Sequence, residues 1–183
     1  MTEETGKLEI NGWTIFAHPC FLDQFESLVE EVEALKQKLP QEYHKKNSAK
    51  RLAAIAKLGF ETIPQDPGKD EYRQRGTLGE NRKHWFRAKF SQQYRLFFRY
   101  HKRSKIIIFG WVNDDQMKRA YGSASDAYKV FGKMLDKGKP PEDWDELLAE
   151  ASGIALSRLT DAIARVNKSD AAPHPTPDFD LVS

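Results

Sequence analysis

The spacing of hydrophobic residues changes along this chain, and each change marks an element. Residues 10–17 predict a first strand, because β-prone side chains are concentrated there, namely Ile10, Trp13, Ile15 and Phe16. From residue 19 to residue 39, apolar positions recur every three or four residues behind Pro19, beside a row of glutamates. This spacing predicts an amphipathic helix with an acidic outer face.

A second helix is predicted over about residues 41–58, after a break at Pro40. Its inward positions are expected to be Tyr43, Ala49, Leu52, Ala53 and Ala56. Its outer face is basic and contains Lys45, Lys46, Lys50, Arg51 and Lys57. The two helices therefore form a hairpin with one acidic and one basic member.

A segment without periodicity separates this hairpin from a set of strands. Prolines and glycines interrupt residues 60–83, and a loop of about two dozen residues in a compact domain is often functional. Strands are predicted over residues 84–90, 94–101 and 105–112, with connections short enough for antiparallel hairpins. Helices are expected through Met117 and Arg119, over residues 126–135, and from Glu142. This order predicts an α+β domain with helices on one face of a mainly antiparallel sheet.

The length of 183 residues suits one ordinary domain, which we expect at residues 1–150, and a modest extension. The extension over residues 151–183 is predicted to begin with a helix and to be disordered from Asp170, where three prolines follow. No stretch approaches the length of a membrane span, and the first residues lack a secretory signal. A single cysteine, Cys20, fits a reducing cytosol, so a cytoplasmic location is expected.

The net charge of +2 conceals a strongly basic region. Residues 41–105 contain 17 Lys and Arg against 6 Asp and Glu, and the rest of the chain is acidic. This asymmetry indicates a face that meets a polyanion, and the alternative is a solvated run of charges. Apart from the strands, the candidate RNA-binding residues are Lys45, Lys46, Lys50, Arg51, Arg73, Arg75, Arg82 and Lys83.

Alternation along the predicted strands gathers four cations on one sheet face, namely Arg87, Lys89, Arg95 and Arg99. Like charges that face each other destabilise a sheet, so we expect an anion to neutralise them. Trp85 and Phe97 are interleaved with the cations, which favours single-stranded nucleic acid, whose bases stack on aromatic rings. The alternative is that these cations protect the sheet against aggregation.

Other kinds of site have little support. The five histidines lack the spacing of a zinc site, and no glycine-rich phosphate loop is present. The pairs Asp114–Asp115 and Glu142–Asp143 are expected to cap helices rather than to hold magnesium. Cys20 is expected to be a small buried hydrophobe. We therefore expect neither a metal nor another cofactor.

RNA can be cut without a metal, because its own 2′-OH attacks the adjacent phosphate. Such an enzyme needs a base, an acid for the departing 5′-oxygen, and cations for the charge on the phosphoryl oxygens. Arginine suits the last role, and histidine, tyrosine or lysine suits the proton transfers.

Five stretches of the chain resemble the YhaV toxin family within the wider RelE-like superfamily: NGWTIFAHPCF (11–21), YRLFFRY (94–100), GWVNDDQMKRAYG (110–122), DAYKVFGKML (126–135) and GKPPEDW (138–144). The resemblance covers roughly residues 8–150. It implies a RelE-like fold, in which a helical hairpin packs on a small antiparallel sheet, and a toxin that cuts mRNA and halts growth. The implied partner is a PrlF-type antitoxin, a swapped-hairpin DNA-binding protein.

The resemblance also implies roles for individual residues. It makes Arg95 and Arg119 ligands of the phosphate and transition state, and Tyr121 the first candidate for proton transfer, with His101 or His84 as a substitute. The expected catalytic residues are Arg87, Arg95, Arg99, Arg119 and Tyr121, and Lys89 joins the RNA-binding residues. A packing role in the turn before Gly122 is the alternative for Tyr121.

Two other functions are open. A protein that binds RNA or the ribosome without chemistry would use the lysines of the second helix. A DNA-binding regulator would use that helix for recognition, but the cations also extend over strands and a loop. We favour a metal-independent endoribonuclease that acts on mRNA, free or on the ribosome.

Overall fold

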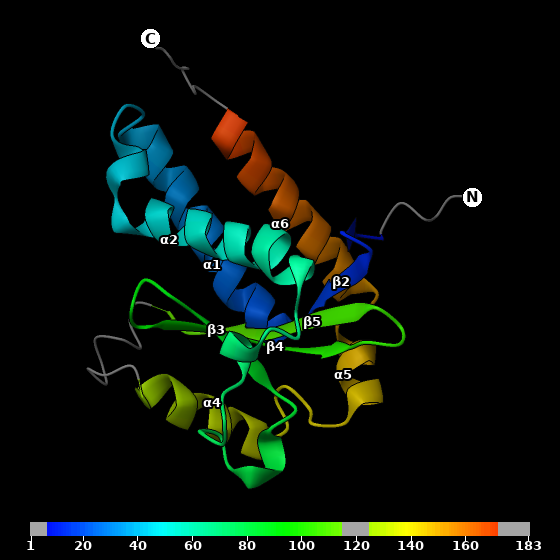
Figure 1. Ribbon diagram of the computed structural model, residues 1–183. Coiled ribbons are helices and arrows are strands. Elements are labelled where there is room, and N and C mark those ends of the chain that lie inside the picture. Colours follow the sequence, from blue (N-terminus) through cyan, green and yellow to red (C-terminus); the bar gives the residue numbers. More distant parts are fainter. Residues whose placement is uncertain (1–6, 115–124, 172–183) are drawn as a thin grey trace.

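The computed structural model describes residues 7–114 and 125–171. Figure 1 shows a central sheet with one group of helices above it and another below it. The α+β class predicted from the sequence is confirmed.

The described residues form a five-stranded sheet in the order β1-β2-β5-β4-β3. The strands are β1 (Glu9–Ile10), β2 (Trp13–Ala17), β3 (Phe86–Phe90), β4 (Tyr94–His101) and β5 (Ile106–Val112). β2 is parallel to β5 and the other neighbours are antiparallel, so the mainly antiparallel sheet is confirmed. The single strand expected over residues 10–17 is instead a hairpin, because Asn11 and Gly12 adopt φ angles of 52° and 86° in a two-residue turn.

Three helices cover one face of the sheet, namely α1 (Pro19–Lys38), α2 (Asn47–Lys57) and α6 (Ile154–Ala171). The larger hydrophobic core lies beneath them and contains Phe21 and Phe25 of α1, Leu159 of α6, and Ile107 and Phe109 of β5. The helix expected after residue 151 is thus present, and it packs into the same core as α1. The division of the chain into domains at that residue stays a prediction.

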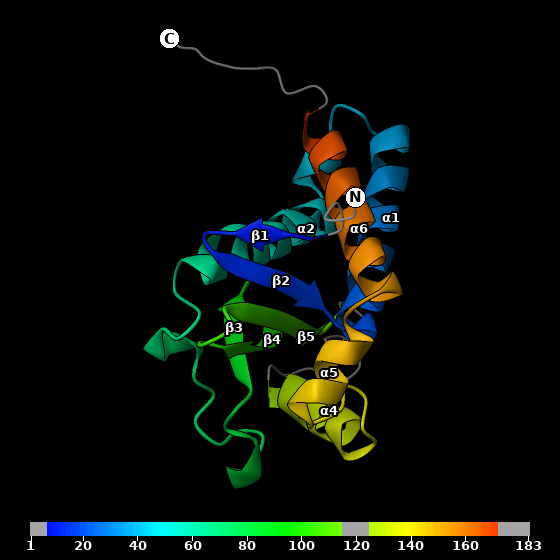
Figure 2. The ribbon, with the colours of Figure 1, turned by 90° about the vertical axis from the view of Figure 1, so that its right-hand side faces the viewer.

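Two helices cover the opposite face, α4 (Ser125–Asp136) and α5 (Trp144–Glu150), as Figure 2 shows from the side. Phe131 of α4 stacks on Phe97 and Trp111, with ring centroids 4.3 and 5.6 Å apart. The expectation that helices occupy only one face is therefore wrong. β4 and β5 carry large apolar side chains on both faces, and both faces need cover from water.

The region before β3 also departs from expectation. α2 begins only at Asn47, after a short 3-10 turn, and further short helical turns occupy parts of residues 58–82. Ala53, expected to point inward, is exposed, whereas Arg51, expected to point outward, is buried. The Arg51 guanidinium lies 5.2 Å from the centre of the Tyr94 ring, so an aromatic face shelters the cation.

Candidate active site

Tyr128 on α4 brings together two arginines from neighbouring strands. Arg87 Nε on β3 donates a hydrogen bond to the Tyr128 hydroxyl at 2.7 Å. Arg95 Nε on β4 donates to the same oxygen at 3.2 Å. Two cations from two strands therefore meet one phenol oxygen contributed by a helix.

The register of the sheet and the packing of α4 explain this meeting. β3 and β4 pair with Lys89 opposite Arg95, which places the strand cations on the face that α4 covers. Phe131 is fully buried against Phe97 and anchors the helix to this face. Because residues three apart share one side of a helix, the anchor also turns Tyr128 toward the sheet.

Arg95 is tied to protein oxygens. Its side chain donates to the Tyr128 hydroxyl and to the backbone carbonyls of Gln92 and Tyr94, at 2.9 and 3.0 Å for the carbonyls. The residue is only 8% exposed, and its backbone N–H donates to Asn113 Oδ1. This geometry suits a residue that orients the phenol more than one that reaches a solvent-borne phosphate.

Arg87 and Lys89 face the solvent more openly. Arg87 is half-buried and donates a second bond, from Nη1 to the Glu71 carbonyl at 2.8 Å, while Lys89 is exposed. The Tyr128 oxygen accepts both of its arginine bonds, so its own proton is left to donate elsewhere. The arrangement can hold an anion beside a phenol that has a proton to give.

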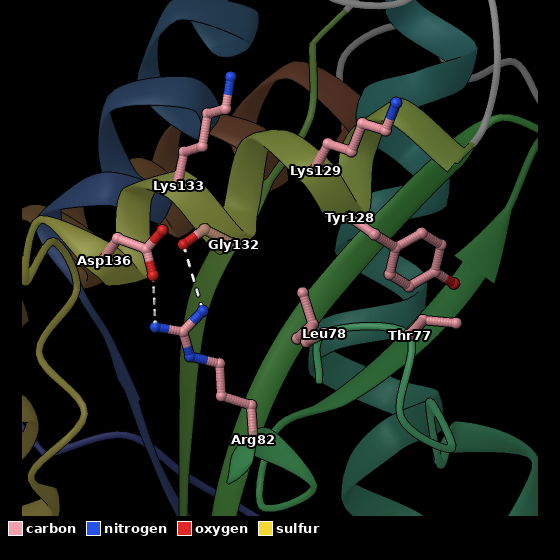
Figure 3. A pocket seen from close by; sticks show the side chains of 8 residues that line it. All are labelled: Thr77, Leu78, Arg82, Tyr128, Lys129, Gly132, Lys133 and Asp136. Carbon is pink, nitrogen blue, oxygen red and sulfur yellow. Dashed lines mark hydrogen bonds and ion pairs between the residues drawn. The ribbon is translucent and has the colours of Figure 1, made fainter. Parts of the chain in front are cut away.

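A groove of about 430 Å³ begins at Tyr128 and follows α4. Figure 3 shows Tyr128 at one end and, at the other, Arg82, whose guanidinium bonds Asp136 and the Gly132 carbonyl. Leu78 and Thr77 form the facing wall. The lining therefore combines cations, a carboxylate and apolar surface.

Arg99 shares the sheet face of the other three strand cations, as predicted, but lies apart from this cluster. It follows Arg95 by four residues on β4, about 13 Å along the strand. Its guanidinium lies 5.7 Å from the ring of Trp85 and 5.2 Å from that of Trp144, and donates to the Glu142 carbonyl. Burial lowers the pKa of the Arg99 guanidinium, although the Glu142 carboxylate opposes this effect.

Glu142 is the centre of a second polar cluster. Its carboxylate accepts hydrogen bonds from His84 Nε2 at 3.0 Å, from Trp85 Nε1 at 3.2 Å, and from Arg82 Nε. Burial disfavours the charged carboxylate, but these hydrogen bonds outweigh it and hold the pKa of Glu142 below its ordinary value. Of the acidic pair expected to cap a helix, only Asp143 does so, by accepting from the Glu146 N–H at the start of α5.

Of the remaining predicted cations, Arg82 lines the same groove as Tyr128, and the others lie elsewhere or pair with nearby carboxylates. Lys45, Lys46 and Lys50 are exposed in and before α2, on the opposite side of the sheet. The loop cations pair with nearby carboxylates, as Arg73 and Arg75 do with Asp70, Lys83 with Glu80, and Arg82 with Asp136 and Glu142. The prediction that Trp85 and Phe97 stack on bases is wrong, because α4 and its neighbours bury both rings completely.

Two predicted catalytic residues, Arg119 and Tyr121, lie outside the described residues. His101 is exposed, with its ring 5.6 Å from that of Trp144 and its Nδ1 2.6 Å from Ser104 Oγ. Sequence reasoning missed Tyr128, although it belongs to the quoted stretch DAYKVFGKML. The sequence offered no signal beyond its place in that stretch.

No group of three or more metal-ligating side chains occurs within residues 7–114 and 125–171. The Cys20 thiol is partly buried, and burial together with Asp23 and Glu150 raises its pKa to about 11, so it stays protonated. None of the described helices is long and apolar enough to cross a membrane.

Comparison with known proteins gives a consistent set of relatives. A family model described as a toxin with endonuclease activity, of toxin-antitoxin system, matches residues 15–152. The chain is 47% identical over 143 residues to Toxin YhaV of Escherichia coli O6:H1 (strain CFT073), covering 77% of this chain and 93% of the relative. It is 46% identical to the Ribonuclease toxin YhaV of Escherichia coli K12, with the same coverage. No solved structure matches the chain.

Proposed function

Because this chain belongs to the YhaV toxin family, toxins with endonuclease activity from toxin–antitoxin systems, we propose that it cleaves RNA at the cluster of Arg87, Arg95 and Tyr128. The convergence of two guanidinium groups on one phenol oxygen carries the proposal. The name of the K12 relative, a ribonuclease toxin, supports RNA as the substrate.

The proposed reaction is attack of the substrate's own 2′-OH on the adjacent phosphate, which breaks the bond to the 5′-oxygen and leaves a 2′,3′-cyclic phosphate. Tyr128 donates its proton to the departing 5′-oxygen, since both arginine bonds leave that proton free. Arg87 and Lys89 stabilise the charge that builds on the phosphoryl oxygens. Arg95 orients the phenol.

The proton of the 2′-OH must pass to a second group, and a tyrosine can accept it only in its deprotonated, phenolate form. Tyr121 is our candidate and Arg119 our further phosphate ligand, on the strength of the family resemblance. They precede Tyr128 by seven and nine residues in the sequence. Arg99, His84 and His101 are left out of the chemistry, because Arg99 and His84 bond Glu142 and His101 lies beside Trp144.

Membership of a toxin–antitoxin system means that an antitoxin is a partner. We propose that this antitoxin is of the PrlF type, that the substrate is mRNA, free or on the ribosome, and that the protein acts in the cytoplasm. The exposed lysines 45, 46 and 50 are then available to bind RNA away from the cutting site.

The test uses the purified chain, a labelled RNA and excess EDTA, with analysis of the product ends. We expect cleavage that leaves 2′,3′-cyclic phosphate or 3′-phosphate ends, and no cut at a position whose 2′-OH is replaced by hydrogen. Products with 3′-hydroxyl ends would overturn the mechanism. RNA that is bound by folded protein but stays intact, both free and on added translating ribosomes, would favour the alternative, an RNA-binding module without chemistry.

A further inference from the structure

The groove beside Tyr128 has the features of a preformed binding site. Gln74 is only 2% exposed and fastens the loop that forms one wall. Its side-chain amide donates to the Arg82 carbonyl at 2.7 Å, and its Oε1 accepts from the Leu78 N–H at 3.1 Å. The same Oε1 accepts from Thr77 Oγ1 at 2.9 Å, so the hydrogen bonds of one buried side chain fix the conformation of this wall.

The far end of the groove offers both a donor and an acceptor. Arg82 Nη2 bonds Asp136 Oδ1 at 2.8 Å, and its Nε bonds Glu142, which fixes the guanidinium in place. The Asp136 side chain is 67% exposed, so its carboxylate can still accept a hydrogen bond from a ligand. A paired guanidinium and carboxylate match the mixed acceptors and donors on the edge of a nucleobase.

The rim of the groove is basic. Lys129 and Lys133 are exposed, one helical turn apart on α4, and pair with no carboxylate of the described residues. Figure 3 shows both side chains extending outward from the helix, away from Arg82. They suit the phosphates of a strand whose base lies in the groove below.

The groove is open because Gly132 lies in its helical wall. A Cβ atom on Gly132 would meet only Arg82 Nη1 within 4 Å outside its own helix, at 3.9 Å, so the immediate space beside this residue is open. Leu78 provides apolar surface on the opposite wall. The groove therefore has room and an apolar contact for a flat ring.

We propose that this groove binds one nucleobase of single-stranded RNA next to the scissile phosphate, and that Arg82 and Asp136 select the base. The inference rests on the proposed function, because it takes the cut to occur at Tyr128. It adds a site that recognises a base. The proposed catalytic cluster, in contrast, contacts only the phosphate, the ribose and the leaving group. Single-stranded RNA is recognised in general by splayed bases that hydrogen-bond at their edges.

The first test measures binding without cleavage. A labelled 2′-O-methyl RNA octamer of mixed sequence is titrated against the full chain and against Gly132→Leu. Leucine favours helix more than glycine does, so the variant is expected to fold while its side chain fills the groove. We expect binding about tenfold weaker, the scale of one lost base contact. Ser157→Leu, at an exposed position of α6 across the sheet, is the matched control and should bind as the unaltered chain does.

The second test maps cut sites on a random-sequence RNA. The unaltered chain should prefer certain bases at one position beside the cut. Asp136→Asn keeps one oxygen to accept from Arg82 but replaces the other carboxylate oxygen with an NH2 donor. The variant should alter the base preference at that position alone. Unchanged affinity in Gly132→Leu together with an unchanged cut-site profile in Asp136→Asn would overturn the inference. The proposed nuclease function would not be affected by that result. If the unaltered chain binds RNA but cuts it neither free nor on translating ribosomes, the proposed function fails, and the binding test still decides whether the groove binds a base.

Discussion

Arg87 Nε lies 2.7 Å from the hydroxyl oxygen of Tyr128, a bond that joins the edge strand β3 to the helix that covers it. The rest of α4 is held on the sheet mainly by apolar contacts, above all those of Phe131. Apolar contacts fix where the helix lies, whereas the hydrogen bond fixes the direction of one functional group. The packing of α4 on the sheet and the orientation of the Tyr128 hydroxyl therefore depend on different contacts, so substitutions can test them separately.

Replacing Tyr128 by phenylalanine should abolish most RNA cleavage without unfolding the protein. Phe retains the edge-on contact with Phe97, whose ring centroid lies 5.6 Å away, and removes only the hydroxyl. Loss of a proton donor typically costs about 100-fold or more in rate. The measurement is the cleavage rate of a labelled RNA, with far-UV circular dichroism as the check on folding.

Tyr94→Phe is the matched control for this substitution. Tyr94 precedes Arg95 on β4, but its hydroxyl lies near Arg51 on the other face of the sheet. The same loss of one oxygen there should leave cleavage unchanged. Equal rates in Tyr128→Phe and the unaltered chain would remove Tyr128 from the mechanism.

The two arginines should respond differently to substitution by alanine. Arg87→Ala should lower kcat/KM by about 100-fold and leave the free energy of unfolding nearly unchanged, because the side chain is half-exposed. Arg95→Ala should lower the free energy of unfolding by about 2 kcal/mol, because it removes hydrogen bonds from the buried Tyr94 carbonyl and the partly buried Gln92 carbonyl. Urea unfolding and cleavage assays on both variants separate these effects. A fully stable Arg95→Ala variant would contradict the supporting role assigned to Arg95.

Strand alternation predicted which face of the sheet carries the strand cations, but not which elements cover that face. Period-two spacing correctly predicted that Arg87, Lys89, Arg95 and Arg99 share one face of the sheet. That periodicity cannot say what packs on a face, and α4 and α5 bury the rings expected to meet RNA. Residues 106–112, IIIFGWV, did indicate this cover, since an unbroken apolar strand is typical of a sheet covered on both sides.

The site itself was predictable only in part. The strand arginines carry charge in an alternating pattern, so their residue types alone mark them as candidates. Tyr128 carries no such mark, because a tyrosine on an amphipathic helix has the same pattern whether it packs or reacts. Its role depends on the contact between α4 and two strands more than 30 residues earlier, and helical periodicity contains no information on that contact.

The stability of the fold should fall as the pH is lowered below about 6.5, owing to His18. His18 is 4% exposed, accepts a bond from the Cys20 N–H through Nδ1, and lies 2.7 Å from Glu150 through Nε2. Burial lowers the pKa of His18, although Glu150 and Asp23 oppose this effect. The unfolded chain therefore takes up a proton at a higher pH than the folded chain does. The stabilisation is complete above the unfolded pKa and is lost as the pH falls toward the folded one.

The measurement is the free energy of unfolding in urea between pH 7.5 and pH 5.5. The slope contributed by His18 cannot exceed about 1.4 kcal/mol per pH unit, the value for one proton. His18→Asn is the control, because asparagine still caps α1 but does not titrate. This variant should lose part of the pH dependence; if its slope equals that of the unaltered chain, His18 is not the source.

Arg158 should contribute more than Arg165 to holding α6 on α1. Arg158 bonds both Glu26 and Asp23, and its side chain and that of Glu26 are 29% and 28% exposed. Arg165 bonds Glu33 alone, and these side chains are 38% and 41% exposed. Less exposed pairs with more hydrogen bonds are screened less by water and salt, so Arg158→Ala should cost about 1–2 kcal/mol and Arg165→Ala about 0.5 kcal/mol. Urea unfolding at low and high salt tests this order, and an Arg165→Ala variant destabilised as much as Arg158→Ala would contradict it.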